Sequence, residues 1–195
     1  EDGPPGNSGL ARPTGGMALA LRLGHRKSVD FDFFSSRAFA PLDFKEHNAL
    51  EGEILQAGEN TLTILHRGVK LSFFGGLSLG VVAPPDDFDT CPVASLEDLG
   101  ACKLAALVNR VECKDYLDIA ALLRHGASLV HLLGCANAVY RGEFPVTVCL
   151  KSLVWFDAPE LSALPPEDRE ILEASALAVD EVPVIALQAP RIAAN

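Results

Sequence analysis

Basic residues are scarce in this chain, and their scarcity excludes one broad class of protein. The 195 residues include 16 Lys and Arg against 26 Asp and Glu, which gives a formal net charge of −10. A protein that coats nucleic acid without sequence preference depends on clustered Lys and Arg. The charge balance therefore argues against a coat protein, although it leaves room for a local basic patch.

Paired cysteine motifs and long apolar runs are also missing. The five cysteines form no Cys-x-x-Cys pair, no histidine stands at a zinc-type spacing from them, and an odd number does not suit a disulfide framework. Reduced thiols in a cytosolic protein are the simpler interpretation. No apolar stretch reaches membrane-spanning length and no secretory signal is visible, so we expect a soluble, cytoplasmic protein with no membrane association. The cysteines are Cys91, Cys102, Cys113, Cys135 and Cys149.

The most informative stretch that is present is residues 26–34, where two acids are set among large apolar residues. Side chains of an extended strand alternate between its faces, so Asp30 and Asp32 share one face while Phe31 and Phe33 take the other. Two carboxylates a few Å apart repel each other, and a divalent cation between them would explain the pair. The alternative is an edge strand whose polar face is solvated.

A glycine pair precedes this strand. Gly15 and Gly16 are followed by an Ala/Leu-rich segment, residues 17–23, that suits a short helix, and then by a basic turn that contains Arg26 and Ser28. Glycines before a helix allow a ligand to approach the backbone closely, and the free amides at a helix start bind phosphate. The order of these features predicts a phosphate cradle followed by a metal-type acid pair.

The whole run from Gly15 to Phe34 resembles a known motif. It reads Gly-Gly-x-Ala-Leu-Ala-Leu-x-Leu-Gly-His-Arg-x-Ser-x-Asp-x-Asp-Phe-Phe, and it is similar to the first motif of the AbiEii/AbiGii-type toxin nucleotidyltransferases. These are bacterial members of the polymerase-β-like nucleotidyltransferase superfamily. The resemblance extends over roughly residues 15–156.

A lysine on an apolar helix face is the second point of resemblance. Ser95 and Asp98 form a capping box that predicts a helix to about Asn109, and Lys103 falls on its apolar stripe. The lysine stem can cover apolar surface while the ammonium reaches water. However, Lys103-Leu104 matches the Lys-Leu motif of the family, which implies that the ammonium reaches across a cleft to the nucleotide phosphates.

The third point is Lys114-Asp115-Tyr116-Leu117-Asp118-Ile119, which opens a helix predicted to end near His125. Acids are favoured at helix starts, so an ordinary ion pair between Lys114 and Asp118 is one interpretation. The segment also resembles the last motif of the family, which implies that Asp118 points inward and that Asp115 orients it or caps the helix.

The resemblance implies a toxin that transfers a nucleotide from a nucleoside triphosphate to an RNA (tRNA) or protein acceptor, with an antitoxin protein as partner. It implies Mg²⁺ or Mn²⁺ as cofactor, with Asp118 orienting or deprotonating the acceptor. Downstream of the acid pair the superfamily usually has a third strand carboxylate, whereas this chain offers only Lys70 and Ser72. Either two acids suffice, or a third comes from the helical half. The implied catalytic residues are Asp30, Asp32, Lys103 and Asp118, with Asp30 and Asp32 on the metal, and the implied nucleotide-binding residues are Gly15, Gly16, Arg26, Ser28 and Lys114.

The predicted fold is α+β, with a small mixed or antiparallel sheet flanked by helices and a helical C-terminal lobe. We expect a disordered tail or expression remnant over residues 1–14 with no strand before the glycine pair, a nucleotidyltransferase core lobe over 15–90, a helical lobe over 91–180 and a tail over 181–195. Within the core lobe we expect one helix in residues 41–60, a hairpin of residues 61–66 and 69–74, a strand over 77–83 and a linker over 84–89. In the helical lobe, Trp155 and Phe156 are expected to be core residues.

Two other functions compete with nucleotidyl transfer. A degenerate fold that binds nucleotide or a protein partner without catalysis would account for the missing strand acid. A generic structural domain would require the ordered motifs to be coincidental.

Overall fold

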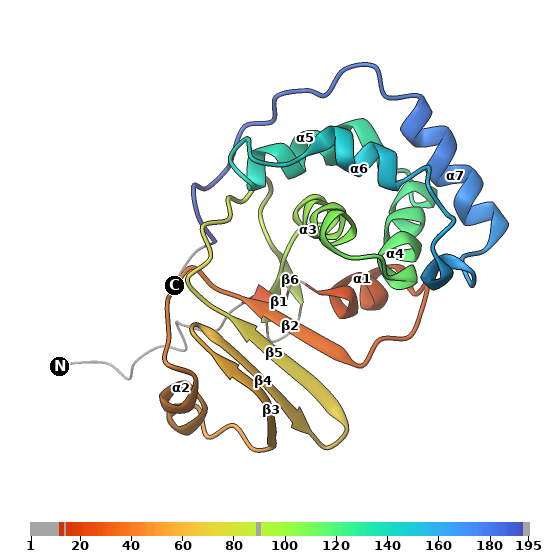
Figure 1. The fold of residues 1–195 in the computed structure, drawn as a ribbon. Helices are drawn as coiled ribbons and strands as arrows, with labels where there is room; N and C mark the ends of the chain where they lie inside the picture. Colours follow the sequence, from red (N-terminus) through yellow and green to blue (C-terminus); the bar gives the residue numbers. More distant parts are fainter. Residues whose placement is uncertain (1–11, 14, 89–90, 193–195) are drawn as a thin grey trace.

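The computed structural model describes residues 12–13, 15–88 and 91–192. A small mixed sheet lies on one side of the molecule and a group of helices on the other (Figure 1). This confirms the predicted α+β class.

The main sheet has the strand order β1-β2-β5-β4-β3. β2 and β5 run parallel, and the remaining neighbours are antiparallel. In the parallel register Asp30 is opposite Lys70 and Asp32 is opposite Ser72, so these four residues share one face. The strands are β1 (Arg12–Pro13), β2 (Asp30–Phe34), β3 (Glu53–Gly58), β4 (Thr61–His66) and β5 (Val69–Phe74).

The hairpin between β4 and β5 forms where the sequence predicts it. Its two turn residues, Arg67 and Gly68, both have positive φ, at 49° and 81°. This backbone conformation matches the twist of the flanking strands, and glycine adopts it without strain.

The expected helix within residues 41–60 was wrong in extent. Helix α2 (Pro41–His47) ends early, and the chain returns as β3, every residue of which is exposed. An exposed edge strand carries little apolar alternation, so its pattern did not distinguish it from a helix. Gly52, with φ of 134°, lets the chain enter the sheet beside the Leu65 carbonyl, where a Cβ would lie 2.6 Å from that oxygen.

Three further expectations around the sheet need correction. β1 pairs with β2, so a short strand does precede the glycine pair, while the rest of the expected tail, residues 1–11 and 14, lies outside the described residues. The expected strand over 77–83 is reduced to one isolated bridge between Val81 and Ala189. The expected linker contributes to a small second sheet of β6 (Asp86–Phe88) and β7 (Cys91–Val93).

Several helices begin or end at residues that are typical helix caps. Ser95 accepts a hydrogen bond from the Asp98 amide at the start of α3, and Ser128 accepts one from the His131 amide at the start of α5. Gly24, with φ of 62°, closes α1. The helices are α1 (Gly16–Leu23), α3 (Leu96–Asn109), α4 (Cys113–Arg124), α5 (Leu129–Val139), α6 (Val146–Ser152) and α7 (Pro166–Leu177), with a 3₁₀ turn at Pro159–Leu161.

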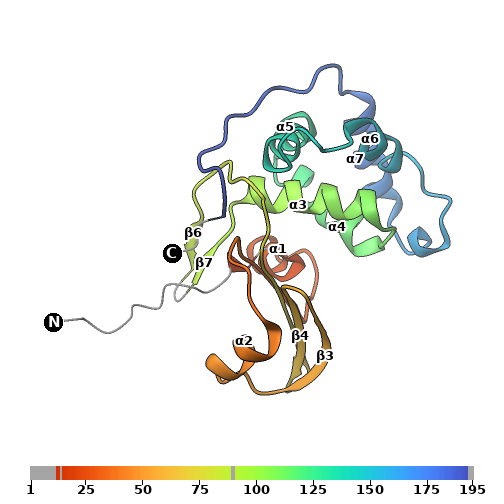
Figure 2. The ribbon, with the colours of Figure 1, turned by 60° about the vertical axis from the view of Figure 1, so that its left-hand side comes forward.

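Two hydrophobic cores hold these layers together. The larger is formed by the helices and includes Leu19 of α1, and the smaller is formed by Leu62, Ile64 and Phe73 of the sheet beneath α2. Helix α1 packs on β2 and also on α3 and α4, so it joins the sheet to the helical group (Figure 2).

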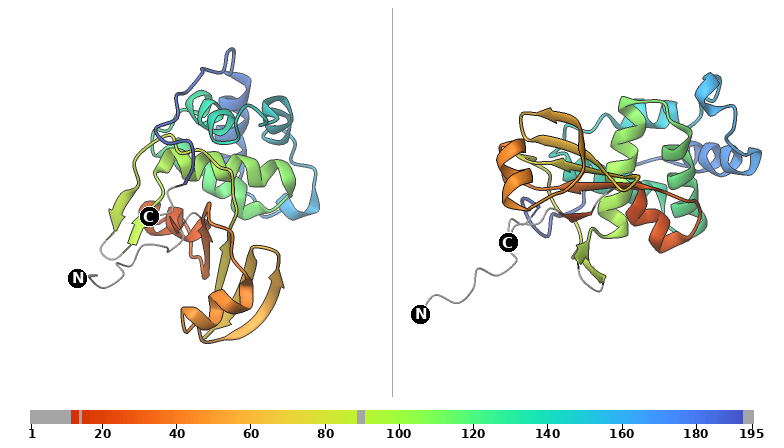
Figure 3. Two further views of the ribbon diagram at one scale, coloured as in Figure 1. Left: turned by 90° about the vertical axis from the view of Figure 1, so that its left-hand side faces the viewer. Right: turned by 90° about the horizontal axis from the view of Figure 1, so that it is seen from below.

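The segment after α7 runs outside α5 and returns toward the sheet (Figure 3). The Val81 amide donates to the Ala189 carbonyl at 2.9 Å, and Ser36 Oγ donates to the Ile192 carbonyl at 2.8 Å. Part of the expected tail is therefore bound to the body of the protein. On α6, Cys149 and the following Leu153 are buried, whereas the expected core residue Trp155 is 51% exposed.

Candidate functional site

Two aspartates of β2 line a hollow between the sheet and the helical group. Asp30 and Asp32 lie on the same strand face, as the alternation predicts. Lys70 Nζ lies 3.2 Å from Asp30 Oδ2, so a lysine on the neighbouring strand pairs with the first acid. Ser72 is 4% exposed and accepts a hydrogen bond from Thr63.

Burial raises the pKa of Asp32, although the charges of Lys103 and Lys70 oppose the rise. A carboxylate in this position is desolvated without a direct ion pair among the described residues. Such a group gains from any cation that enters the hollow.

Side chains pack closely around the glycine pair at the start of α1. A Cβ at position 15 would collide with the Asp32 carboxylate, and one at position 16 would collide with the Arg26 guanidinium and lie 3.3 Å from Lys103 Nζ. No side chain caps α1. The first amides of this helix are therefore available to an anion beside the acid pair.

Cations surround the two carboxylates. The hollow has a volume of about 190 Å³ and is lined by basic side chains from the loop after α1, from β5, from the middle and end of α3, and from the start of α4. This is the local basic patch that the overall charge of −10 left possible. Its lining residues are Gly16, Arg26, Lys27, Ser28, Val29, Asp30, Asp32, Lys70, Lys103, Arg110 and Lys114.

A second acid pair lies beneath this basic lining. Asp115 and Asp118 of α4 are both 0% exposed. Lys103 Nζ lies 2.8 Å from a carboxylate oxygen of each, and Arg110 Nε donates to Asp115 at 2.9 Å. Buried charges are stable only when they are paired in this way.

Asp118 also binds the loop after α1. Arg26 donates to both of its carboxylate oxygens, from Nε at 2.6 Å and from Nη2 at 2.9 Å, and His25 Nε2 lies 2.6 Å from Oδ1. Burial alone would raise the pKa of Asp118, but the Arg26 hydrogen bonds and the Lys103 charge outweigh it, and the pKa is lowered. The same pair raises the pKa of Arg26.

The position of Asp118 differs from the one expected. Its carboxylate does not line the hollow but lies behind Arg26 and Lys103, which cover it. The ion pair considered between Lys114 and Asp118 is also not formed, because Lys114 Nζ lies 2.8 Å from Glu112 instead. Sequence spacing places Lys114 and Asp118 on one helix, but it does not tell which residues from other segments form ion pairs with them.

The structure brings most of the sequence-predicted residues to one place. Gly16, Arg26, Ser28, Asp30, Asp32, Lys103 and Lys114 line the hollow, and Gly15 lines the cavity next to it. Sequence reasoning missed Lys27, Lys70, Arg110 and His25. Arg110 could have been found, because it lies on the same helical stripe as Lys103.

Asp30 and Asp32 offer two carboxylates, the donor set of magnesium sites in which the substrate supplies further ligands. No group of three His, Cys, Asp or Glu side chains able to hold a metal occurs among the residues that the structure describes. Mg²⁺ is commonly bound by one or two carboxylates together with substrate phosphates. Asp30 and Asp32, with the basic lining around them, fit that arrangement.

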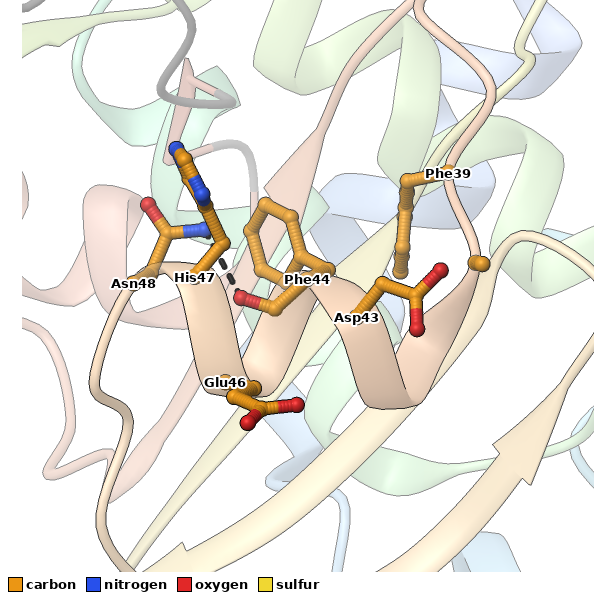
Figure 4. Close-up of a pocket in the computed structure, with 7 residues that line it drawn as sticks. Phe39, Asp43, Phe44, Glu46, His47 and Asn48 are labelled. Atoms are coloured by element: carbon orange, nitrogen blue, oxygen red, sulfur yellow. Dashed lines mark hydrogen bonds between the residues drawn. The ribbon is translucent and has the colours of Figure 1, made fainter.

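A larger hollow of about 490 Å³ lies elsewhere, along α2 (Figure 4). Phe39 and Phe44 form its apolar part, and Asn48 Nδ2 donates to the Phe44 carbonyl at its end. Its lining contains Asp43, Glu46 and His47 but no lysine or arginine. Size alone therefore does not identify the functional site.

A mixed sheet with two aspartates on one strand, facing a helix start and a cation-rich helical group, has the arrangement expected of a polymerase-β-like nucleotidyltransferase. The chain belongs to the AbiEii family of toxin nucleotidyltransferases. Residues 67–181 match the family described as nucleotidyl transferase AbiEii toxin, type IV TA system. The match spans β5 to α7, with Lys103, Asp115 and Asp118, and it confirms the family that the sequence resembles, whereas residues 15–34 lie outside the matched range.

An uncharacterized protein of Aquifex aeolicus (strain VF5) is also similar. It is 32% identical over 149 residues, which are 73% of this chain and 72% of that protein. Within the described residues, no helix combines the length and the apolar character needed to cross a membrane.

Proposed function

We propose that this chain is a metal-dependent nucleotidyltransferase and the toxin of a toxin–antitoxin pair, transferring a nucleotide from a nucleoside triphosphate to an RNA (tRNA) or protein acceptor. One observation carries the proposal: six basic side chains and the start of α1 surround two carboxylates in a single hollow. A triphosphate complements such a lining, and its bound cation complements the carboxylates. A cytoplasmic location and an antitoxin partner follow from the same proposal.

Asp30 and Asp32 would hold Mg²⁺ or Mn²⁺, which supplies charge neutralisation for the triphosphate and the leaving pyrophosphate. Gly15, Gly16 and Ser28 hold the phosphates through backbone amides and a hydroxyl. Arg26, Lys103 and Lys114 bind the phosphate charges as they shift during transfer. The acceptor oxygen forms a new bond to the α-phosphorus, the bond to the β-phosphate oxygen breaks, and pyrophosphate leaves.

Asp118 acts as a positioning residue in this scheme. Both of its oxygens are engaged by Arg26, and its carboxylate is fully buried, so it does not reach an acceptor. It holds Arg26 and Lys103 at the hollow instead, since each donates to it. Among the described residues, Asp30 and Asp32 are the only acids in the lining, so the acceptor proton passes to one of them or to solvent.

The experiment that tests this function uses the protein with Mg²⁺, total RNA and each labelled nucleoside triphosphate in turn. Labelled RNA or labelled protein is the expected product, and the Asp30→Asn/Asp32→Asn double variant is the control. Equal labelling by the parent and the double variant would refute the metal-dependent transfer.

The ion pair between Lys70 and Asp30 favours a second candidate function. An ammonium 3.2 Å from Asp30 competes with a metal ion for that carboxylate. A protein that binds triphosphate but transfers no label under the same conditions would be the nucleotide-binding form without catalysis.

A further inference from the structure

A second cavity adjoins the ionic hollow and differs from it in chemistry. It has a volume of about 270 Å³ and shares Asp32, Lys103 and Arg110 with the ionic hollow. The rest of its lining consists of two phenylalanines, three small residues and one uncharged amide, Asn109. Together the two spaces reach the roughly 300–1,000 Å³ typical of a small-molecule site, with one charged end and one apolar end.

The aromatic wall of this cavity continues the acid strand. Phe34 follows Asp32 by two residues and therefore takes the same face of β2. Its ring meets that of Phe74 edge to face, with centroids 5.5 Å apart. The two residues are opposite each other at the ends of β2 and β5. On this face of β2 the carboxylate of Asp32 is thus followed by the ring of Phe34, next to the proposed phosphate site.

The opposite wall is helix α3, and its small residues leave the space open. Cys102 and Ala106 lie one turn apart on this wall, and Asn109 follows at the helix end. Asn109 Nδ2 donates to the Ala105 carbonyl at 2.8 Å, which fixes the amide. One N–H and the carbonyl oxygen of Asn109 then have no hydrogen-bond partner among the described residues that lie around this cavity.

We propose that this cavity binds the nucleoside of the nucleotide donor, with the base between Phe34 and the α3 wall and with Asn109 reading the base edge. The inference rests on the proposed function, because the shared residues place this cavity next to the triphosphate. Flat bases stack on aromatic side chains, and an amide with one donor and one acceptor pairs with a base edge.

The test compares inorganic tripolyphosphate with the four nucleoside triphosphates, each with Mg²⁺ and without acceptor. Tripolyphosphate occupies only the ionic hollow, so the difference in affinity measures the nucleoside. Ala106→Met fills the cavity from a helix position that tolerates methionine, and Val108→Met is the matched control on the same helix away from the cavity.

The expected result is that the parent binds at least one nucleoside triphosphate more tightly than tripolyphosphate. Ala106→Met should reduce that affinity about tenfold, the size of one lost base stack, and leave tripolyphosphate binding unchanged. Val108→Met should change neither. Asn109→Ala should alter the ratio of affinities among the four triphosphates.

Three outcomes would overturn the inference. If nucleoside triphosphates bind no more tightly than tripolyphosphate, the cavity contributes nothing to donor binding. If Ala106→Met slows label transfer while donor affinity stays the same, the cavity receives a nucleoside of the acceptor instead. If tripolyphosphate itself fails to bind the parent, the phosphate site is wrong, and the proposed function fails together with the inference.

Discussion

The protein contains two pairs of aspartates that lie close together but in opposite states. Asp115 and Asp118 are fully buried and are neutralised by three basic side chains from two other segments. Asp30 and Asp32 line an open hollow, and the one ion pair that they form among the described residues, from Lys70 to Asp30, joins two side chains that are 39% and 33% exposed.

The difference shows that the two pairs of aspartates have different roles in one site. The buried pair forms ion pairs within the fold, and these hold Lys103 and Arg26 in place. The carboxylates of the open pair are left accessible to a ligand, and three of the six basic side chains that line the same hollow are held by the buried pair. The following predictions test this difference, in order of decreasing effect.

Asp118→Asn should produce the largest loss of stability. The amide keeps the shape but leaves Arg26 and Lys103 without their counter-charge, and breaking a buried pair costs about 3–5 kcal/mol. Urea unfolding measures the change. Lys103→Met should destabilise by a similar amount, and the double variant should cost less than the sum of the two. An Asp118→Asn protein as stable as the parent but inactive would instead identify Asp118 as a catalytic base.

Asp30→Asn and Asp32→Asn should remove ligand-dependent stabilisation without loss of intrinsic stability. Mg²⁺ with a nucleoside triphosphate at 100 times its Kd should stabilise the parent by about 2.7 kcal/mol, because the ligand binds only the native state. Each variant should lose most of this stabilisation, measured as the ligand-dependent rise in Tm. The ligand-free Tm should equal the parent's or be higher, since carboxylate repulsion is relieved. An unchanged metal-dependent shift in the double variant would contradict the metal site.

Lys70→Met should have a small effect on stability, within the roughly 0.2–1 kcal/mol of an exposed ion pair. Because Asp30 then has no competing ammonium, Mg²⁺ alone should bind more tightly, as measured by the metal concentration at half-maximal Tm shift. Lys45→Met, on α2 and outside the lining of the hollow, is the control for charge removal at a distance. Weaker Mg²⁺ binding would show that Lys70 supports the site rather than competing with the metal.

The pH dependence of the free energy of unfolding should differ between the two aspartate pairs, and Asp32 should have the smallest effect. The pKa of Asp118 is lowered, so its contribution to stability is present above the ordinary aspartate value of about 3.8 and is lost as pH falls through the lower folded value. The pKa of Asp32 is raised, so its contribution is present below about 3.8 and is lost as pH rises through the higher folded value.

Asp118→Asn should therefore flatten the acid side of the stability profile, and Asp32→Asn should slightly raise stability at neutral pH relative to the parent. Unfolding curves recorded from acid to neutral pH measure both changes. Parallel profiles for the two variants would mean that the pairs do not differ as described.

Much of the secondary structure could be predicted because its signals are local. Ser95 and Ser128 mark helix starts, Arg67 and Gly68 mark a turn, and the apolar spacing of α3 and α4 predicts their faces. β3 could not be predicted, because an exposed edge strand shows no alternation against a core. Trp155 was placed wrongly because α6 ends at Ser152, before the tryptophan, and hydrophobicity alone does not tell whether a residue beyond a helix end is covered.

The sequence by itself determined that Asp30 and Asp32 share a strand face, that Lys103 lies on an apolar helix stripe, and that the ordered motifs belong to one family. Strand and helix periodicity fix these relations between near neighbours along the chain. Only the tertiary structure decided that Asp118 would be covered by Arg26 and Lys103, that Lys70 would reach Asp30, and that Phe34 would face α3 across a cavity. Those relations join residues that are distant in sequence, and they depend on how sheet and helices pack, which periodicity does not encode.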